Sequence, residues 1–302
     1  MRALAEFIMR GRLQACLVAL VGNLVPIVSA AAVGLVTLRC QLRDGIVVCA
    51  WALLPVLVAV LWADINPVLV TSSIASVLVV LVVAQILKQT ASWPRTLVSV
   101  VGLCVFAYVL VGVLVPAPLA ALVEDLRATL VQLGQDGGME QGVSFFHLLI
   151  AATAMGLGVE HIEATFVTGF LAWLTAINAI ICLLVARWWQ ALLYNPGGFQ
   201  QEFHRLRLDR VIALGLVLAI VACNLAPVGY ATWASLLELP LLLAGLGVVH
   251  YTAHFWNLGT AWLVAMYLGL LLFGPLSLVL IGIGFLDSVY DLRARLKARK
   301  GQ

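Results

Sequence analysis

Apolar runs of about 20 residues follow one another along almost the whole chain, and a run of that length matches a helix that crosses the hydrocarbon of a bilayer. Hydrophobic residues make up 64% of the 302 residues, charged residues make up 10%, and the mean hydropathy is +1.10. Such a chain folds in lipid, where each backbone N–H and C=O must be paired within a helix or a closed barrel. We predict an all-α, polytopic integral membrane helical bundle, with one membrane domain over residues 1–302.

Polar breaks divide the chain into eight apolar segments, and two of these segments contain a helix breaker. The segments lie near residues 13–38, 45–62, 67–87, 97–115, 143–186, 211–229, 236–250 and 256–291. Pro26 and Pro275 should each split a segment into two short helices, because proline lacks the N–H and clashes with the preceding turn. The count is therefore eight to ten membrane segments. A half of about 15 residues reaches only ~23 Å of a ~30 Å hydrocarbon layer, so full crossing and re-entry both stay open.

The Lys and Arg residues fall in five clusters, which predict the side of the membrane that each connection faces. The clusters lie at 2–12, 39–43, 88–95, 187–210 and 293–300 and hold 16 of the 17 basic residues. With ten passes all five clusters share one side, which the positive-inside rule makes the cytoplasmic side. Only Arg127 falls on the other side. We therefore expect both termini, and the basic tail 292–302, in the cytoplasm.

The longest connection, residues 116–142, is expected on the extracytoplasmic side. It opens with Pro116 and closes with Gly137-Gly138, and between them apolar residues recur at helical spacing: Leu119, Leu122, Val123, Leu126, Leu130 and Leu133. This pattern predicts an amphipathic helix that lies on the outer leaflet over the bundle.

Residues 187–210, RWWQALLYNPGGFQQEFHRLRLDR, form the most distinctive stretch. We expect a helix to leave the membrane at Arg187, with Trp188, Trp189 and Tyr194 in the headgroup zone that suits amphipathic rings. Beyond Gln190, the sequence Asn195-Pro196-Gly197-Gly198 predicts a turn that leads into Phe199.

A short cytoplasmic surface helix should follow this turn. Phe199, Phe203 and Leu206 recur at i, i+4 and i+7, and Glu202 and Arg205 are spaced to pair on its polar side. Anionic lipid is the expected contact of three arginines, Arg205, Arg207 and Arg210. A second interpretation makes the stretch a topology anchor without a specific partner.

Five blocks of the sequence carry a family resemblance: ALAEFIMRGRLQA, WALLPVL, ARWWQALLYNPGGF, LLLFGPL and DSVYDLR, the last at 287–293. They resemble the YybS-like family of uncharacterised bacterial integral membrane proteins, a domain of unknown function. The resemblance implies a multi-pass protein of the bacterial inner (cytoplasmic) membrane. That family is distantly similar to the substrate-binding membrane subunits of energy-coupling-factor transporters. The Glu160-His161-Ile162-Glu163 cluster departs from the family pattern.

Polar residues inside the apolar segments are the candidates for a solute pocket. Glu160, His161 and Glu163 lie within a 44-residue apolar stretch, where ionisable side chains are functional candidates, and Asn178 lies further along it. A second interpretation places the charged cluster at the outer water interface. Asn178 and Asn224 should bond across helices.

The sequence offers no catalytic residue set, nucleotide-binding motif or cofactor motif, and we expect no enzyme activity. His250 and His254 are four apart but lack a third ligand, so no metal site is predicted. A net charge of +3 in short clusters does not indicate nucleic acid.

The expected partners are the lipid bilayer and other membrane subunits. The leading hypothesis is a membrane-embedded subunit that binds or transports a small solute of unknown identity. The alternative is a cell-envelope scaffold without transport activity.

Overall fold

The computed structural model describes residues 1–136 and 161–300, and all regular structure in these ranges is helical. Five stretches are long and apolar enough to cross a membrane: α4 (Leu42–Trp62), α5 (Pro67–Thr90), α6 (Trp93–Leu114), α9 (Ala164–Tyr194), and Val228–Phe255, which joins η3 (Val228–Tyr230) to α12 (Ala231–Phe255). The chain is therefore an all-helical, multi-pass membrane protein.

The described chain contains further helices that are shorter or less apolar. They are α1 (Arg2–Met9), α2 (Arg12–Val21), η1 (Gly22–Leu24), α3 (Pro26–Arg39), α7 (Pro116–Asp136), α10 (Gly198–His204), α11 (Arg210–Leu225), α13 (Thr260–Leu272), α14 (Pro275–Tyr290) and α15 (Leu292–Lys300). α13 and α14 meet at a 120° bend, and counted as one span they bring the membrane-capable total to six. The finer count of eight to ten segments depends on whether the short helices cross.

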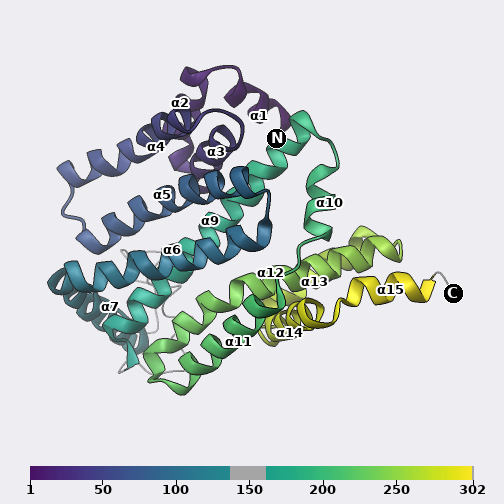
Figure 1. Cartoon of the computed structure of the whole chain (residues 1–302). Helices are drawn as coiled ribbons and strands as arrows, with labels where there is room; N and C mark the ends of the chain where they lie inside the picture. The colour runs from purple at the N-terminus through teal and green to yellow at the C-terminus, as the bar shows by residue number, and fades with distance from the viewer. Residues whose placement is uncertain (137–160, 301–302) are drawn as a thin grey trace.

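α9 is the central helix of the bundle (Figure 1). It contacts α3, α5, α6 and α12, and side chains along its length, such as Phe166, Phe170 and Leu183, are almost fully buried. α12 in turn packs against α11 and α14. Large apolar side chains such as Phe106 on α6 and Leu218 on α11 remain exposed on the outer faces, as expected where lipid replaces water.

The break predicted at Pro26 is present, and its freed backbone groups are paired. Val25 is extended, as a residue before proline must be, and Pro26 opens α3 at the position where its missing N–H costs nothing. Asn23 donates from Nδ2 to the Ala19 and Ala52 carbonyls at 2.9 and 3.0 Å, and Ser29 donates to Ala19 at 2.7 Å. α3 is too short to span hydrocarbon but is sheltered, since most of its side chains are buried.

Close contacts at two glycines hold α12 against α14. A Cβ placed on Gly245 would lie 2.0 Å from the Leu280 carbonyl oxygen, and one placed on Gly284 would lie 2.1 Å from the Leu241 carbonyl oxygen. Such distances are impossible for a real side chain. The two backbones therefore touch directly, which only glycine permits.

The five basic clusters meet at one end of the bundle, together with both termini and α10 (Figure 1). The contacts that join them are Arg12 with Asp44, Lys88 with the Thr37 and Cys40 carbonyls, Arg39 over the Tyr194 ring, Arg187 with Glu202, and Arg293 with the His204 carbonyl. We call this the basic end. The α4–α5 connection and α7 lie at the opposite end.

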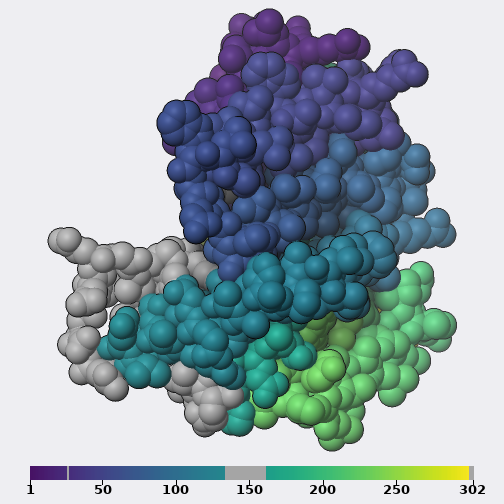
Figure 2. Space-filling view, turned by 90° about the vertical axis from the view of Figure 1, so that its left-hand side faces the viewer, coloured from purple at the N-terminus to yellow at the C-terminus, as the bar shows by residue number. Residues whose placement is uncertain are grey.

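α7 is the predicted amphipathic helix, and it runs across the end of the molecule opposite the basic clusters (Figure 2). Leu119, Leu122, Val123 and Leu126 are buried against the bundle, while Glu124 is exposed. The Asn66 side chain caps α5 through Val68 N and donates to the Pro118 carbonyl at 2.9 Å, which ties the start of α7 to the start of α5. The prediction that this helix lies on the outer leaflet belongs to the topology proposed below.

Candidate functional site

A cavity of about 990 Å³ opens at the α7 end, between α3, α4, α5, α6, α7 and α9. Its walls are apolar, formed by residues such as Val56, Leu69, Leu122, Leu171 and Leu174. Its polar lining consists of Asn23, Ser29, Asp64, Asn66, Ser72, Ser73, Ser76, Tyr108, Asp125, Thr175 and Asn178. An apolar cleft with a few converging polar groups is the usual form of a small-molecule site.

Two interhelical hydrogen bonds form the inner part of this cavity. Asn178 of α9 donates from Nδ2 to Ser76 Oγ of α5 at 2.7 Å, as the sequence predicted for a mid-span asparagine. Tyr108 of α6 and Thr175 of α9 share a hydrogen bond of 2.6 Å between their hydroxyls. Ser76 accepts its bond, so its own hydroxyl proton can still be donated. The cavity therefore presents preorganised donors and acceptors well below its mouth.

The mouth of the cavity carries its charge. Asp64 lies in the α4–α5 connection and is exposed, and Asp125 lies on α7. Among the described lining residues these two carboxylates are the only charged groups. The exposed Asp64 carboxylate favours neutral or cationic solutes over anions at the mouth.

The structure separates Asn178 from His161 and Glu163, which the sequence grouped with it as one pocket. Asn178 lines the cavity, but Glu163 is the exposed residue that precedes α9, about 22 Å earlier along the helix axis, and His161 is exposed beside it. Neither belongs to the described lining, and Glu160 lies outside the described residues. The helix geometry is the reason, since 15 residues of a straight helix cannot fold back into one site.

The serines, Tyr108 and the two aspartates were missed from the sequence. A signal existed for part of this set, because Ser72, Ser73 and Ser76 interrupt an otherwise apolar segment. The expectation for Asn224 was wrong, because it donates to the Ile220 carbonyl of its own helix.

Glu202 joins three helices within the 187–210 stretch and beside it. Glu202 of α10 receives two hydrogen bonds from the Arg187 guanidinium of α9 and a third, at 3.3 Å, from the Trp93 indole of α6. Arg187 also donates to Gln190 Oε1 at 2.5 Å. The predicted pairing of Glu202 with Arg205 is therefore wrong, because the Arg187 guanidinium binds both carboxylate oxygens of Glu202.

The aromatic residues of this stretch divide between core and surface. α9 runs on past Arg187 to Tyr194, and in this last part Trp189 faces the bundle and is 1% exposed, whereas Trp188 is 37% exposed. The expected place of Trp189 among the headgroups is wrong because its side chain is buried in the bundle. Tyr194 is exposed, with the Arg39 guanidinium 4.3 Å from its ring centroid.

The predicted turn is present after α9. Asn195 and Pro196 are exposed, the Asn195 carbonyl accepts from Gly198 N, and Gly197 has a φ of 83°, where glycine is favoured. Phe199 then stacks on Phe203 at 6.1 Å. Leu206 is buried just beyond the end of α10.

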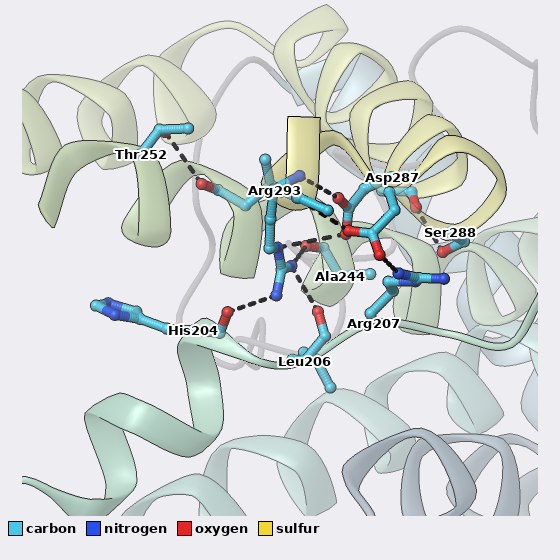
Figure 3. A network of polar contacts seen from close by, with 12 residues as sticks. His204, Leu206, Arg207, Ala244, Thr252, Asp287, Ser288 and Arg293 are labelled. Carbon is cyan, nitrogen blue, oxygen red and sulfur yellow. Dashed lines mark hydrogen bonds and ion pairs between the residues drawn. The ribbon is translucent and has the colours of Figure 1, made fainter. Parts of the chain in front are cut away.

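Behind α10, a buried network joins three parts of the basic end (Figure 3). Arg293 faces Asp287 with its Nε 3.3 Å from Oδ2, and both side chains are buried. Its terminal nitrogens donate to the carbonyls of His204 and Leu206 at 2.5 and 2.6 Å. The DSVYDLR block thus binds the α10–α11 connection to the α14–α15 corner.

The three arginines expected on anionic lipid lie in different settings. Arg207 forms an ion pair with Asp291, whereas Arg205 and Arg210 are exposed. His204 and His254 face each other with ring centroids 5.2 Å apart, and His250 bonds to the Tyr267 hydroxyl at 2.8 Å. No group of three or more metal-ligating side chains is found among the described residues.

A scan of family models, a search of curated proteins and a search of solved structures each found no match to this chain. The resemblance to the YybS-like family therefore stays a proposal.

Proposed function

We propose that this protein is a membrane-embedded subunit that binds or transports a small polar solute, held in the cavity between α3, α4, α5, α6, α7 and α9. The cavity itself carries the proposal. Its volume of about 990 Å³ lies at the upper end of the range of small-molecule sites, about 300–1,000 Å³. The lining mixes apolar walls with hydroxyl and amide groups from α5, α6 and α9, a combination that orients a solute by hydrogen bonds.

The charge of the lining narrows the class of solute. Asp64 places an exposed carboxylate at the mouth, and the hydroxyls of Ser72, Ser76 and Thr175 follow toward the inside. A small solute with a cationic group and several hydrogen-bonding groups fits this order, with the cation at the mouth. An anion of the same size would meet the Asp64 carboxylate during entry, which costs binding free energy.

The wider setting belongs to the same proposal. The basic end faces the cytoplasm of a bacterial inner membrane and the cavity opens on the other side, as the positive-inside rule favours. The sequence carries no nucleotide-binding motif, so active transport would need other membrane subunits as partners. A cell-envelope scaffold without transport activity is the alternative that the binding experiment distinguishes.

Thermal stabilisation of the purified protein tests the proposal. A panel of amino alcohols, polyols, amino acids and cationic metabolites should contain at least one solute that raises the unfolding temperature, with anions of equal size inactive. Asn178→Ala should abolish that shift, because it removes the amide from the inner part of the cavity. It costs only about 1 kcal/mol of stability, the size of one interhelical hydrogen bond.

Asn224→Ala is the matched control. Asn224 also lies in an apolar helix, close to its end, but its amide bonds within α11 and does not line the cavity. This variant should keep the full ligand shift. If no solute in the panel stabilises the protein, the result supports the scaffold alternative. If Asn178→Ala keeps the ligand-induced shift in unfolding temperature, the solute does not bind in this cavity.

A further inference from the structure

A second, smaller cavity of about 300 Å³ opens at the basic end, between α10, the α10–α11 connection, the end of α12 and α15. Its lining consists of Gln201, His204, Arg205, Arg207, Tyr251, Asp291, Arg293 and Lys297. Four of these eight side chains are permanent cations, and they come from segments about 90 residues apart in the sequence.

The positive charge of this cavity exceeds the negative charge that faces it. Asp291 pairs with Arg207, and the buried Asp287 faces Arg293 from behind. Two carboxylates against four cations leave a net charge of +2. Burial, together with His254, His250 and Arg293, lowers the pKa of His204 to about 4, so His204 is neutral near pH 7 and serves as a hydrogen-bonding group.

The fold fixes Arg293 as the back wall of the cavity. Its guanidinium is committed to the His204 and Leu206 carbonyls and to Asp287, so it contributes charge without being free to move. Lys297 and Arg205 are exposed at the rim and can turn toward a ligand. Arg293 therefore supplies a fixed positive charge, and Lys297 and Arg205 supply hydrogen-bond donors that can move.

Tyr251 gives an independent indication that this cavity suits a ligand with a hydrogen-bond acceptor. Its hydroxyl is buried and has no hydrogen-bond partner among the described residues. Its ring lies 5.9 Å from Arg293 Cζ and 5.9 Å from Lys297 Nζ, so two cations bracket it. An unpaired buried hydroxyl is unfavourable, and an anionic oxygen beside it would satisfy the group.

We propose that this cavity binds a phosphate group, with Arg205, Lys297 and the Tyr251 hydroxyl as its direct donors and Arg207 and Arg293 as fixed countercharge. Phosphate matches the site because it spreads negative charge over several acceptor oxygens and pairs well with guanidinium groups. Two sources present the same chemistry at a membrane surface: the headgroup of an anionic phospholipid and a soluble phosphate. Arg210 does not line the cavity and takes no part.

The experiment uses the full-length protein in two arms. In the lipid arm, the protein is reconstituted into phosphatidylcholine nanodiscs with or without phosphatidylglycerol, and retained lipid is counted by native mass spectrometry. In the soluble arm, inorganic phosphate and ADP are titrated onto the phosphatidylcholine sample, and the unfolding temperature is followed. Retained phosphatidylglycerol assigns the site to a lipid headgroup, whereas stabilisation by phosphate or ADP assigns it to a soluble ligand.

Three variants make the test specific to this cavity. Arg205→Gln and Lys297→Gln should each weaken binding at least about fivefold, the size of one surface cation–anion contact, and Tyr251→Phe should weaken it by a similar factor while leaving the ring in place. Arg210→Gln is the matched control and should bind as the parent does. The proposal is overturned if neither arm shows binding, or if Arg210→Gln weakens binding as much as Arg205→Gln.

Discussion

At the scale of single residues, two neighbouring ion pairs differ in solvent exposure: Asp287 with Arg293 is buried, and Arg207 with Asp291 is partly exposed. Asp287 has no exposed side-chain surface and Arg293 is 9% exposed, whereas Arg207 and Asp291 are 33% and 41% exposed. Removing one partner of a buried pair leaves an uncompensated charge in a medium of low dielectric constant, while an exposed pair is screened by water.

The two pairs predict different costs for the same chemical change. Asp287→Asn should lower the free energy of unfolding by about 3 kcal/mol or more, and Asp291→Asn should change it by less than about 1 kcal/mol. Asn at 291 can keep the left-handed backbone, φ 52°, and still accept from Ala294 N. Denaturation of both variants in one detergent measures the difference, and equal losses would contradict the assignment.

Residue-level patterns predicted local roles better than they predicted partners. The sequence was sufficient to anticipate the interhelical bond of Asn178, because it follows from an amide residue in the middle of an apolar segment. It paired Glu202 with the nearby Arg205. The true partner, Arg187, is 15 residues away and becomes adjacent only when the chain turns at Gly197.

At the scale of elements, the contact between α12 and α14 depends on glycine in both helices. Gly284 has the Leu241 carbonyl where a Cβ would stand, while Gly282, two residues earlier on the same helix, has nothing within 4 Å. The pair offers an internal comparison, since an alanine has the same helix propensity at either position.

Gly284→Ala should therefore destabilise the protein by about 1–3 kcal/mol, because the added methyl group forces α12 and α14 apart. Gly282→Ala should cost nothing and can add a few tenths of a kcal/mol through helix propensity. Thermal unfolding of the two variants in the same detergent checks this. A loss at Gly282 that equals the loss at Gly284 would show that the two backbones do not touch.

Element boundaries show what periodicity can and cannot reveal. Pro26 and Pro275 predicted real helix breaks, since proline acts through local geometry. The turn predicted at Asn195-Pro196-Gly197-Gly198 likewise coincides with the end of α9 at Tyr194. The sequence could not show that Arg187, expected where the helix leaves the membrane, is paired with Glu202.

At the scale of the whole molecule, the distribution of charge defines two ends. Basic clusters gather with both termini, and the acidic mouth of the larger cavity lies at the far end. The proposed topology places the basic end in the cytoplasm. The sequence predicted this gathering by parity alone, but not the cavity, since its lining comes from six helices that only packing brings together.

Labelling of single cysteines checks the topology. Gln200 of α10 and Gln132 of α7 are both exposed and lie at opposite ends. A membrane-impermeant maleimide added to intact cells should label Gln132→Cys above the level of the parent chain, and Gln200→Cys only after permeabilisation. The reverse pattern would place the cavity mouth in the cytoplasm.

α9 has a mechanical consequence of its own. Its 31 residues extend about 46 Å without a break, and it carries Asn178 in the cavity and Arg187 on the Glu202 carboxylate, nine residues apart. A tilt of this rigid helix that an occupant imposes at Asn178 would also move α10, which is joined to α9 by the Glu202–Arg187 pair. A partner that touches α10 at the basic end could therefore sense a filled cavity.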